Sequence, residues 1–215
     1  MGNETEEGDL WMLRQPVFWI GGSACAGKST LARRYAEKYG LALYACDEHY
    51  DDHLKRITAE EQPGMSRIAQ LTVNEVFLTR KVQEQLDTYI ECFQEDFALV
   101  LDDLACMGST PVVVEGNQLL PALVAPLLKK TDRAIWIVPA EEFQWEHYSK
   151  REWIQGILQE TEDPMMAFRN WMKRDALFAG SVKEAAAGLK LHLLEVDGST
   201  TLQQNFERIE EYFSS

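Results

Sequence analysis

The sequence lacks several features that would assign the protein to common functional classes. Of its 215 residues, 21 are Lys or Arg and 35 are Asp or Glu, which gives a formal net charge of −14 at pH 7. Such an acidic chain is repelled by phosphate backbones, so we expect neither a nucleic acid nor an anionic membrane as a partner. No apolar run approaches the roughly 20 residues needed to cross a bilayer. No basic segment followed by an apolar run indicates a secretory signal.

The chain is also poor in cysteine. Its four cysteines are Cys25, Cys46, Cys92 and Cys106, and none of their spacings is C-x-x-C. The sequence therefore offers neither a zinc-ribbon pattern nor a disulfide framework, and reduced thiols are typical of the cytoplasmic location that we expect. There is no internal repeat and no low-complexity linker. We expect a single domain over residues 1–215, a length that can bury a core without covalent staples.

One short motif is complete. Residues 22–29 read Gly-Ser-Ala-Cys-Ala-Gly-Lys-Ser and fit the phosphate-binding loop pattern G-x-x-x-x-G-K-[ST] at every position. An apolar, β-prone run over 17–20 precedes it, and a helical run over 29–39 follows it and ends at Gly40. A strand, a glycine loop and a helix in this order direct backbone N–H groups toward a phosphate chain. These flanking elements favour that interpretation over a chance glycine-rich turn.

The motif assigns particular roles to its residues. Lys28 is expected to reach the β- and γ-phosphates, and the Ser29 hydroxyl is expected to ligate a metal. We therefore predict ATP and Mg²⁺ as ligands. The predicted nucleotide-binding residues of the loop are Gly22, Ser23, Ala24, Cys25, Ala26, Gly27, Lys28, Ser29 and Thr30.

Strands and helices are predicted to alternate along the chain. The strands are expected at about 16–20, 41–46, 111–116, 134–139 and 189–196, and a closing helix at 200–213. Continuous apolar strands between helices indicate a parallel sheet covered on both faces, which is a three-layer α/β/α fold. Ligands of such sheets bind at the carboxyl ends of the strands.

The long segment between the second and third strands is predicted to be helical. After a polar break near Pro63 and Gly64, helical periodicity runs from about 66 to 107. Within it, residues 98–103 resemble an apolar strand followed by the paired acids Asp102 and Asp103. Apolar residues recur there at helical spacing, which favours a helix over a strand that ends in metal-binding acids.

Two carboxylates are placed at the ligand edge by this strand assignment. Asp47 follows the second strand, where it can accept the proton of an acceptor hydroxyl or hold the metal; a helix N-cap is the alternative. Glu115 ends the third strand and is predicted to help hold the hydration shell of Mg²⁺ or to bind a substrate hydroxyl, so the predicted metal set is Ser29, Asp47 and Glu115. The alternative for Glu115 is a solvated strand end.

Cations are expected after the fourth strand. Arg169, Lys173 and Arg174 are spaced to share roughly one side of a helix, and Lys150 and Arg151 form a second group. We predict Arg169 and Arg174 as catalytic residues alongside Lys28 and Asp47. A solvated helix face paired with neighbouring acids is the alternative.

Taken together, the glycine loop with Asp47, the strand that ends at Glu115 and the later basic segment resemble the nucleoside/nucleotide and shikimate kinase-like group of P-loop kinases. The resemblance implies a helical acceptor-binding insert over about 51–110. It also implies a mobile helical lid over about 141–188 that brings arginines to the phosphates, and a loop against adenine that here contains Asp197 and Gly198.

The predicted function follows from the motif and the resemblance. We expect an ATP- and Mg²⁺-dependent phosphotransferase that acts on a hydroxyl or phosphate of a small-molecule acceptor, as a monomer or homodimer. A P-loop NTPase switch or motor and a nucleotide-binding regulator are the alternatives. A GTPase is disfavoured because the chain has no N-K-x-D motif for guanine.

Overall fold

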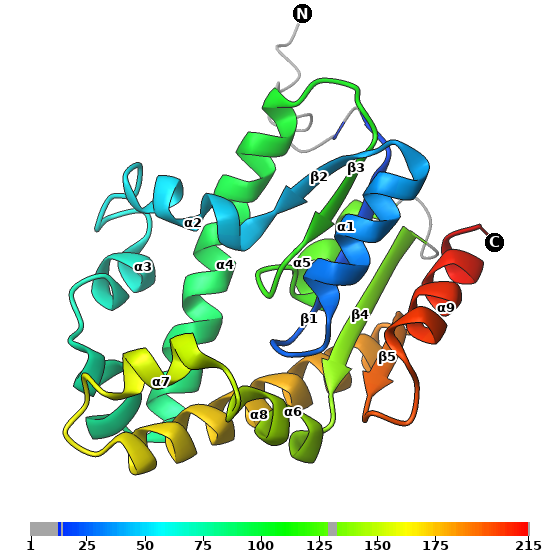
Figure 1. Cartoon of the computed structure of the whole chain (residues 1–215). Coiled ribbons are helices and arrows are strands. Elements are labelled where there is room, and N and C mark those ends of the chain that lie inside the picture. The colour runs from blue at the N-terminus through cyan, green and yellow to red at the C-terminus, as the bar shows by residue number, and fades with distance from the viewer. Residues whose placement is uncertain (1–12, 14, 129–132, 215) are drawn as a thin grey trace, which may run out of the picture.

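A five-stranded parallel sheet forms the centre of the protein (Figure 1). The computed structural model describes residues 13, 15–128 and 133–214. The strand order is β2-β3-β1-β4-β5 and every pair of neighbours is parallel. The strands are β1 Val17–Gly22, β2 Ala42–Ala45, β3 Val112–Glu115, β4 Ala134–Pro139 and β5 His192–Val196. The prediction of a five-stranded parallel sheet is confirmed.

Successive side chains of a strand point to opposite faces of the sheet, so the strands contribute to two separate cores. In β4, Trp136 packs into one core, whereas Ile135 and Ile137 pack into the other. In β1, Trp19 and Ile20 are divided in the same way. All of these side chains are almost completely buried. Apolar residues on both faces of a strand are the pattern expected of a sheet that helices cover on both sides.

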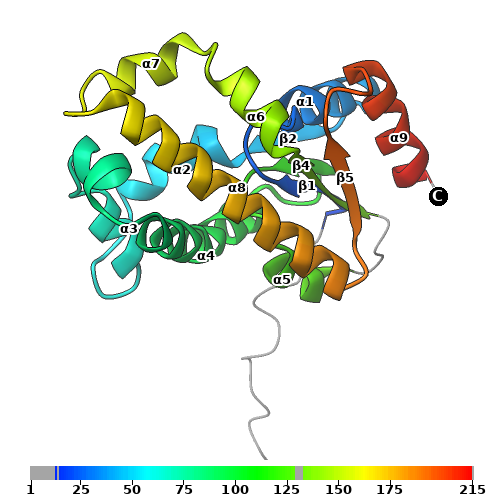
Figure 2. The same ribbon diagram turned by 90° about the horizontal axis from the view of Figure 1, so that it is seen from below.

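Helices cover the two faces unequally (Figure 2). One face carries α1 Lys28–Tyr39 and α9 Leu202–Ser214, and the other carries α4 Val82–Cys106, α5 Pro121–Val124 and α8 Pro164–Gly188. The 3-10 turn η2, Ala125–Leu127, follows α5 directly. The predicted three-layer α/β/α fold is therefore confirmed. Within the described residues, none of the helices combines the length and apolarity that spanning a bilayer requires.

The insert after β2 differs from its prediction. The expected continuous helical stretch from 66 to 107 is divided into α3 Pro63–Ile68, the π-helical turn η1 Glu75–Thr79 and α4. Pro63 does not break a helix but begins α3, because a proline at the first helical position loses no hydrogen bond. Extended backbone at Arg80 and Lys81 separates η1 from α4. Residues 98–103 lie inside α4, so the helix is confirmed and the strand alternative is excluded.

Two predicted strand ends also need correction. The helix α2, Cys46–Leu54, begins directly after Ala45, so Cys46 belongs to a helix and not to the strand. At the other end of the chain, α8 extends to Gly188 and Lys190 adopts a left-handed conformation with φ of 56°. Such a residue commonly follows a helix C-terminus, and β5 accordingly begins at His192 rather than at 189.

A cluster of polar side chains, largely buried, joins the insert to β2. The side chain of His53, on α2, lies 2.5 Å from Asp96 and 3.0 Å from Asp103, which are both on α4. The Tyr44 hydroxyl of β2 donates to Asp103 at 2.8 Å. Burial raises the pKa of Asp96, although its hydrogen bond with His53 opposes that shift. These contacts give His53 a structural role.

The segment after β4 forms a third, smaller core. It comprises α6 Glu141–Tyr148, α7 Glu152–Leu158 and the first part of α8. Buried side chains from all three helices pack together, and Ala24 and Cys25 of the glycine loop contact this cluster. The later part of α8 is different, because Phe178 and Val182 belong to the main core under the sheet. A lid over 141–188 would therefore have to exclude the C-terminal half of α8.

Candidate functional site

The glycine loop connects β1 to α1, as the motif predicts. Its backbone needs conformations that most residues avoid, with φ of 130° at Gly22, 71° at Cys25 and 80° at Gly27. A Cβ atom at Gly22 would lie 1.9 Å from the carbonyl oxygen of Ile137 on β4, so only glycine fits there. Gly27 stands at the N-cap of α1. The loop is thus held against β4 and runs straight into the positive end of a helix.

Lys28 lies inside the loop. Its side chain is 7% exposed, and its Nζ donates to the carbonyl oxygen of Ser23 at 2.7 Å. Burial lowers the pKa of Lys28, while the charges of Glu115 and Asp47 oppose that shift. The ammonium group is therefore fixed at the middle of the loop, where the motif places the phosphates of a nucleotide.

A cavity of about 310 Å³ opens in front of the loop. Its lining includes much of the predicted nucleotide-binding set, together with side chains from α2, from the segment after β3 and from the start of α7. The lining residues are Ala24, Cys25, Gly27, Lys28, Ser29, Thr30, Asp47, Asn117 and Arg151. Of the other predicted loop residues, Ser23 and Ala26 are buried, and Gly22 ends β1 against β4. The cavity and its glycine cradle fit a polyphosphate.

The two predicted carboxylates reach this edge of the sheet from neighbouring strands. Asp47 lies in the first turn of α2 and lines the cavity, and Glu115 is the last residue of β3. Glu115 is 3% exposed, and burial raises its pKa, although Lys28 and the Ser29 hydroxyl oppose that shift. Among the described residues there is no group of three or more His, Cys, Asp or Glu side chains arranged to bind a metal. One hydroxyl and two carboxylates nevertheless fit a Mg²⁺ ion that also binds phosphates and water.

Arg151 lines the cavity, whereas Arg169 and Arg174 were the arginines that the sequence predicted as catalytic. It precedes α7, and its Nη2 lies 3.7 Å from the Sγ of Cys25. Its guanidinium carbon lies 4.9 Å from the centroid of the Tyr148 ring. Burial raises the pKa of Cys25, and the charges of Arg151 and Lys28 oppose that shift. The signal in the sequence was the pair Lys150-Arg151 soon after the fourth strand.

The three basic residues that were predicted to share one side of α8 have different environments in the structure. Arg174 is 6% exposed, and its Nε and Nη2 donate to Oδ1 of Asp175 at 2.9 and 2.7 Å. Arg169 and Lys173 are exposed and do not line the cavity. At 3.6 residues per turn, Arg174 lies about 140° around the helix from Arg169, whereas Lys173 lies only about 40° from it. The expectation that the three share one side was therefore wrong for Arg174.

Arg174 and Asp175 form a buried pair near the loop. Burial raises the pKa of Asp175, with Arg174 as the main opposing influence, and the charge of Lys28 also contributes. The indole N–H of Trp171 donates to Asp175 at 3.2 Å, and the Arg174 guanidinium carbon lies 4.3 Å from the centroid of the Tyr89 ring. The catalytic assignments of Arg169 and Arg174 stay predictions.

The loop after β5 lies beside the glycine loop. Asp197 is exposed and accepts hydrogen bonds from the backbone N–H and the hydroxyl of Ser199. A Cβ at Gly198 would lie 3.2 Å from the ring of Phe143, and one at Gly27 would lie 3.5 Å from Leu202. Neither Asp197 nor Gly198 lines the cavity, so their contact with adenine stays a prediction.

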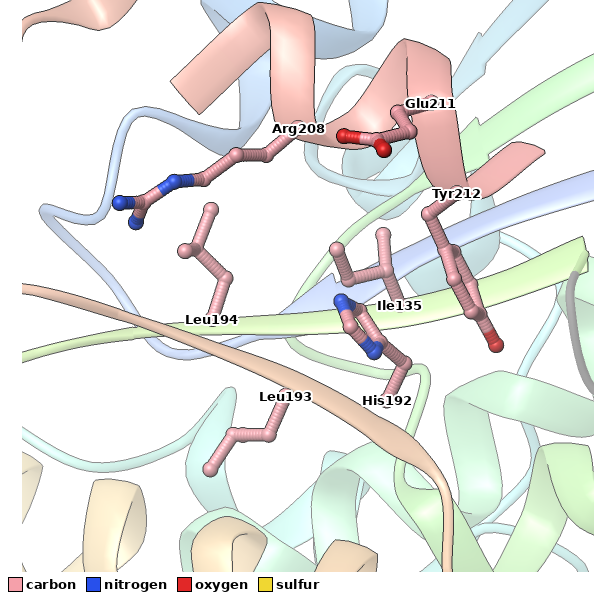
Figure 3. Close-up of a pocket in the computed structure, with 7 residues that line it drawn as sticks. All are labelled: Ile135, His192, Leu193, Leu194, Arg208, Glu211 and Tyr212. Carbon is pink, nitrogen blue, oxygen red and sulfur yellow. The ribbon is translucent and has the colours of Figure 1, made fainter. Parts of the chain in front are cut away.

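A second cavity, of about 420 Å³, lies between β4, β5 and α9 (Figure 3). Its lining residues are Ile135, His192, Leu193, Leu194, Arg208, Glu211 and Tyr212. The rings of His192 and Tyr212 stack with their centroids 4.0 Å apart. Ile135 and His192 lie near the amino ends of their strands, so this cavity is far along the sheet from the glycine loop.

Comparison with known proteins identifies no family. No protein-family model matches the chain, and neither does any curated protein. A shikimate kinase from Acinetobacter baumannii in complex with shikimate is 15% identical with a TM-score of 0.49, and the match covers 93% of each chain. A shikimate kinase from Bacteroides thetaiotaomicron is 13% identical with a TM-score of 0.47, over 93% of this chain and 99% of that one.

A shikimate kinase from Aquifex aeolicus is 14% identical with a TM-score of 0.41, over 92% of this chain and 96% of that one. The chain itself carries the three-layer P-loop fold that the sequence resemblance implied, with its glycine loop between β1 and α1.

Proposed function

We propose that the protein is an ATP- and Mg²⁺-dependent phosphotransferase that transfers the γ-phosphoryl group of ATP to a small-molecule acceptor. The observation that carries this proposal is the cavity in front of the glycine loop. It brings Lys28, Ser29, Asp47 and Arg151 together from three separate segments of the chain. Phosphoryl transfer needs little more than a phosphate cradle, a metal, cations and a group that orients or deprotonates the acceptor.

Each side chain has a distinct part in the proposed reaction. Lys28 and Arg151 stabilise the negative charge that spreads over the phosphoryl oxygens during transfer. The Ser29 hydroxyl and the carboxylates of Asp47 and Glu115 would hold Mg²⁺, which when bound neutralises phosphate charge. Asp47 also orients the acceptor group and receives its proton. One oxygen–phosphorus bond forms to the acceptor as the bond to the departing ADP breaks, so the products are the phosphorylated acceptor and ADP.

A P-loop NTPase module without an acceptor is a weaker alternative. Its main support in the sequence was the acid pair Asp102-Asp103, which lies on α4 rather than at the end of a strand. Asp103 is instead hydrogen-bonded to Tyr44 and paired with His53 and Arg56. ATP chemistry and free thiols at all four cysteines are consistent with a cytoplasmic location, which is part of this proposal.

The test is nucleotide binding followed by turnover of a Lys28→Ala variant. Titration calorimetry with a non-hydrolysable ATP analogue and Mg²⁺ should show one site in the wild type. ATP consumption across a panel of metabolites should then reveal an acceptor, and Lys28→Ala should lower kcat by about 10²–10³-fold, because a fixed charge is lost from the transferring group. Absence of analogue binding by the folded wild type would overturn the proposal.

A further inference from the structure

The buried side chain of Gln144 joins α6 to the glycine loop. Gln144 is 1% exposed, and its Nε2 donates to the carbonyl oxygen of Ala24 at 3.0 Å, across 120 positions of the sequence. A glutamine suits this place because it supplies a long donor without a charge that would be costly to bury. Ala24 lines the cavity and Gln144 does not, so the hydrogen bond holds the loop from outside the cavity.

The carbonyl group that Gln144 holds belongs to the same peptide unit as the N–H of Cys25. This peptide bond is trans, so its C=O and N–H groups point in opposite directions. Since the carbonyl points toward α6, the N–H of Cys25 points away from that helix. Backbone N–H groups of a glycine loop are the groups that bind phosphates. The direction of one of them therefore depends on Gln144.

Backbone strain at Cys25 gives this hydrogen bond its importance. The φ of Cys25 is 71°, which costs free energy for a residue with a Cβ, whereas Gly22 and Gly27 adopt positive φ without that cost. A half-turn rotation of the peptide unit between Ala24 and Cys25 would bring φ to the negative values that most residues prefer. It would also reverse the N–H. The hydrogen bond from Gln144 opposes this rotation, because the rotated carbonyl would lose its donor.

The preceding peptide units of the loop are held by other groups. The N–H of Ser23 donates to the carbonyl oxygen of Ile137 on β4 at 3.1 Å, and the carbonyl oxygen of Ser23 accepts from Lys28 at 2.7 Å. The sheet and the loop itself thus fix the backbone up to Ser23. The strained unit that follows Ala24 depends instead on a side chain from α6.

We propose, on the basis of the nucleotide site described above, that Gln144 is a positioning residue for ATP binding. It keeps the peptide unit between Ala24 and Cys25 in the orientation in which the Cys25 N–H donates to a phosphate, and it touches neither the nucleotide nor the acceptor itself. Without its donor, the unit rotates, one phosphate ligand is lost, and a carbonyl oxygen replaces it beside the negative charge of the phosphates. Nucleotide affinity therefore depends on a residue outside the loop.

The first experiment removes the donor and retains the length of the side chain. In titration calorimetry with the ATP analogue and Mg²⁺, Gln144→Met should raise the Kd by about five- to tenfold. Gln15→Met is the matched control, because Gln15 is also buried and its Nε2 donates to the carbonyl oxygen of Leu104 at 2.7 Å. Gln15 precedes β1, at the opposite end of that strand from the glycine loop. An unchanged Kd in Gln144→Met, or an equal rise in Gln15→Met, would overturn the inference.

The second experiment tests the role of strain, which a merely structural contact would not reproduce. A glycine adopts the φ of residue 25 without cost, so in a Cys25→Gly background the unit has no reason to rotate. There Gln144→Met should change the Kd by less than about twofold. Cys25→Ala is the control background, since alanine also lacks the thiol but keeps the Cβ, and Gln144→Met should retain its full effect in it. A full effect in both backgrounds would contradict the proposal.

Thermal unfolding of each variant without nucleotide separates positioning from folding. If Gln144→Met does not unfold cooperatively, Gln144→Glu takes its place, because an ionised glutamate has a similar shape and no donor, and it should weaken binding at least as much. Failure of the folded wild type to bind the analogue would overturn the proposed function together with this inference. Binding by the wild type that is equally strong in both Gln144 variants would overturn this inference alone.

Discussion

Arg151 contributes positive charge to the cavity from the segment after β4. Its guanidinium contacts the ring of Tyr148 and the thiol of Cys25, so its position is fixed by packing on both sides. Cys25 is itself strained, with a positive φ of 71° in the middle of the loop. Backbone strain of this kind is often retained at functional sites. The loop and Arg151 therefore form one packed unit.

This geometry predicts different effects for two arginines of the lid region. Arg151→Ala should lower kcat by about 10–10³-fold, because it removes a charge beside the phosphates. Arg169→Ala is the matched control, since Arg169 is exposed on α8 and outside the cavity lining, and it should change kcat by less than twofold. Steady-state turnover of both variants checks the assignment. The reverse order would restore the sequence-based prediction for Arg169.

A second prediction at the residue scale concerns Glu115 and the pH dependence of the protein's stability. Its pKa in the folded protein is raised above the ordinary value of 4.5, mainly by burial. The folded state therefore binds a proton more readily than the unfolded chain, and stability decreases as the pH rises from about 4.5 through the folded pKa. Glu115→Gln removes this titration and should raise the Tm more at pH 7 than at pH 4.

Thermal unfolding of both proteins at the two pH values measures this effect. The same variant should lose turnover, because the carboxylate is part of the predicted metal set. A Tm difference that is equal at pH 4 and pH 7 would show that the charge of Glu115 carries no cost in the folded protein.

At the scale of elements, α6 and α7 pack beside the glycine loop, whereas the C-terminal half of α8 packs under the sheet. The Nε2 of Gln144, on α6, donates to the carbonyl oxygen of Ala24 in the glycine loop at 3.0 Å. Buried residues of α7, such as Ile154, pack in the small cluster beside the loop rather than in the main core. The C-terminal half of α8 packs under the sheet. We therefore propose that a movable lid comprises α6, α7 and the start of α8, which is a narrower segment than the sequence predicted.

Hydrogen exchange tests where this lid ends. Addition of the ATP analogue and Mg²⁺ should increase protection of backbone amides over residues 149–158, because Arg151 gains phosphate contacts and holds the start of α7. Residues 178–186 are the internal control, since they already pack in the core and should not change. Equal changes in both segments, or none in either, would argue against a lid with this boundary.

At the scale of the whole molecule, the sheet links every part of the site. The glycine loop and Asp47 follow strands of one sheet and Glu115 ends another, and the strand register aligns Ala45, Glu115 and Ile20 with one another. Their relative positions therefore depend on a single cooperative structure rather than on flexible segments. The net charge of −14 makes the cations at the loop more significant, because the rest of the surface repels a nucleotide.

A single cooperative domain predicts a simple thermal response. Unfolding should occur in one transition, and the ATP analogue at 100 times its Kd should add about 2.7 kcal/mol of stability. For a chain of this size, that corresponds to a rise in Tm of about 5–10 °C. Calorimetry of the wild type with and without the analogue measures both quantities, and Lys28→Ala serves as the control with a smaller shift. Two separate transitions would contradict the single domain.

The sequence by itself determined those features that depend on short-range pattern. The glycine loop could be predicted because its residue types are required by local backbone geometry, as the close approach of Gly22 to Ile137 illustrates. The parallel sheet could be predicted from its apolar runs. Asp47 and Glu115 followed from the sheet, because parallel strands bring their carboxyl ends to one edge.

Only the tertiary structure decided which side chains complete the site. The spacing of Arg169, Lys173 and Arg174 could not reveal that α8 buries Arg174 against Asp175, because burial depends on what packs against each face of a helix. Asn117 carries no motif at all. It lines the cavity because the fold brings the segment after β3 to the glycine loop, and the Tyr89 hydroxyl orients its amide. Such properties arise from contacts between distant segments, which a pattern along one chain does not encode.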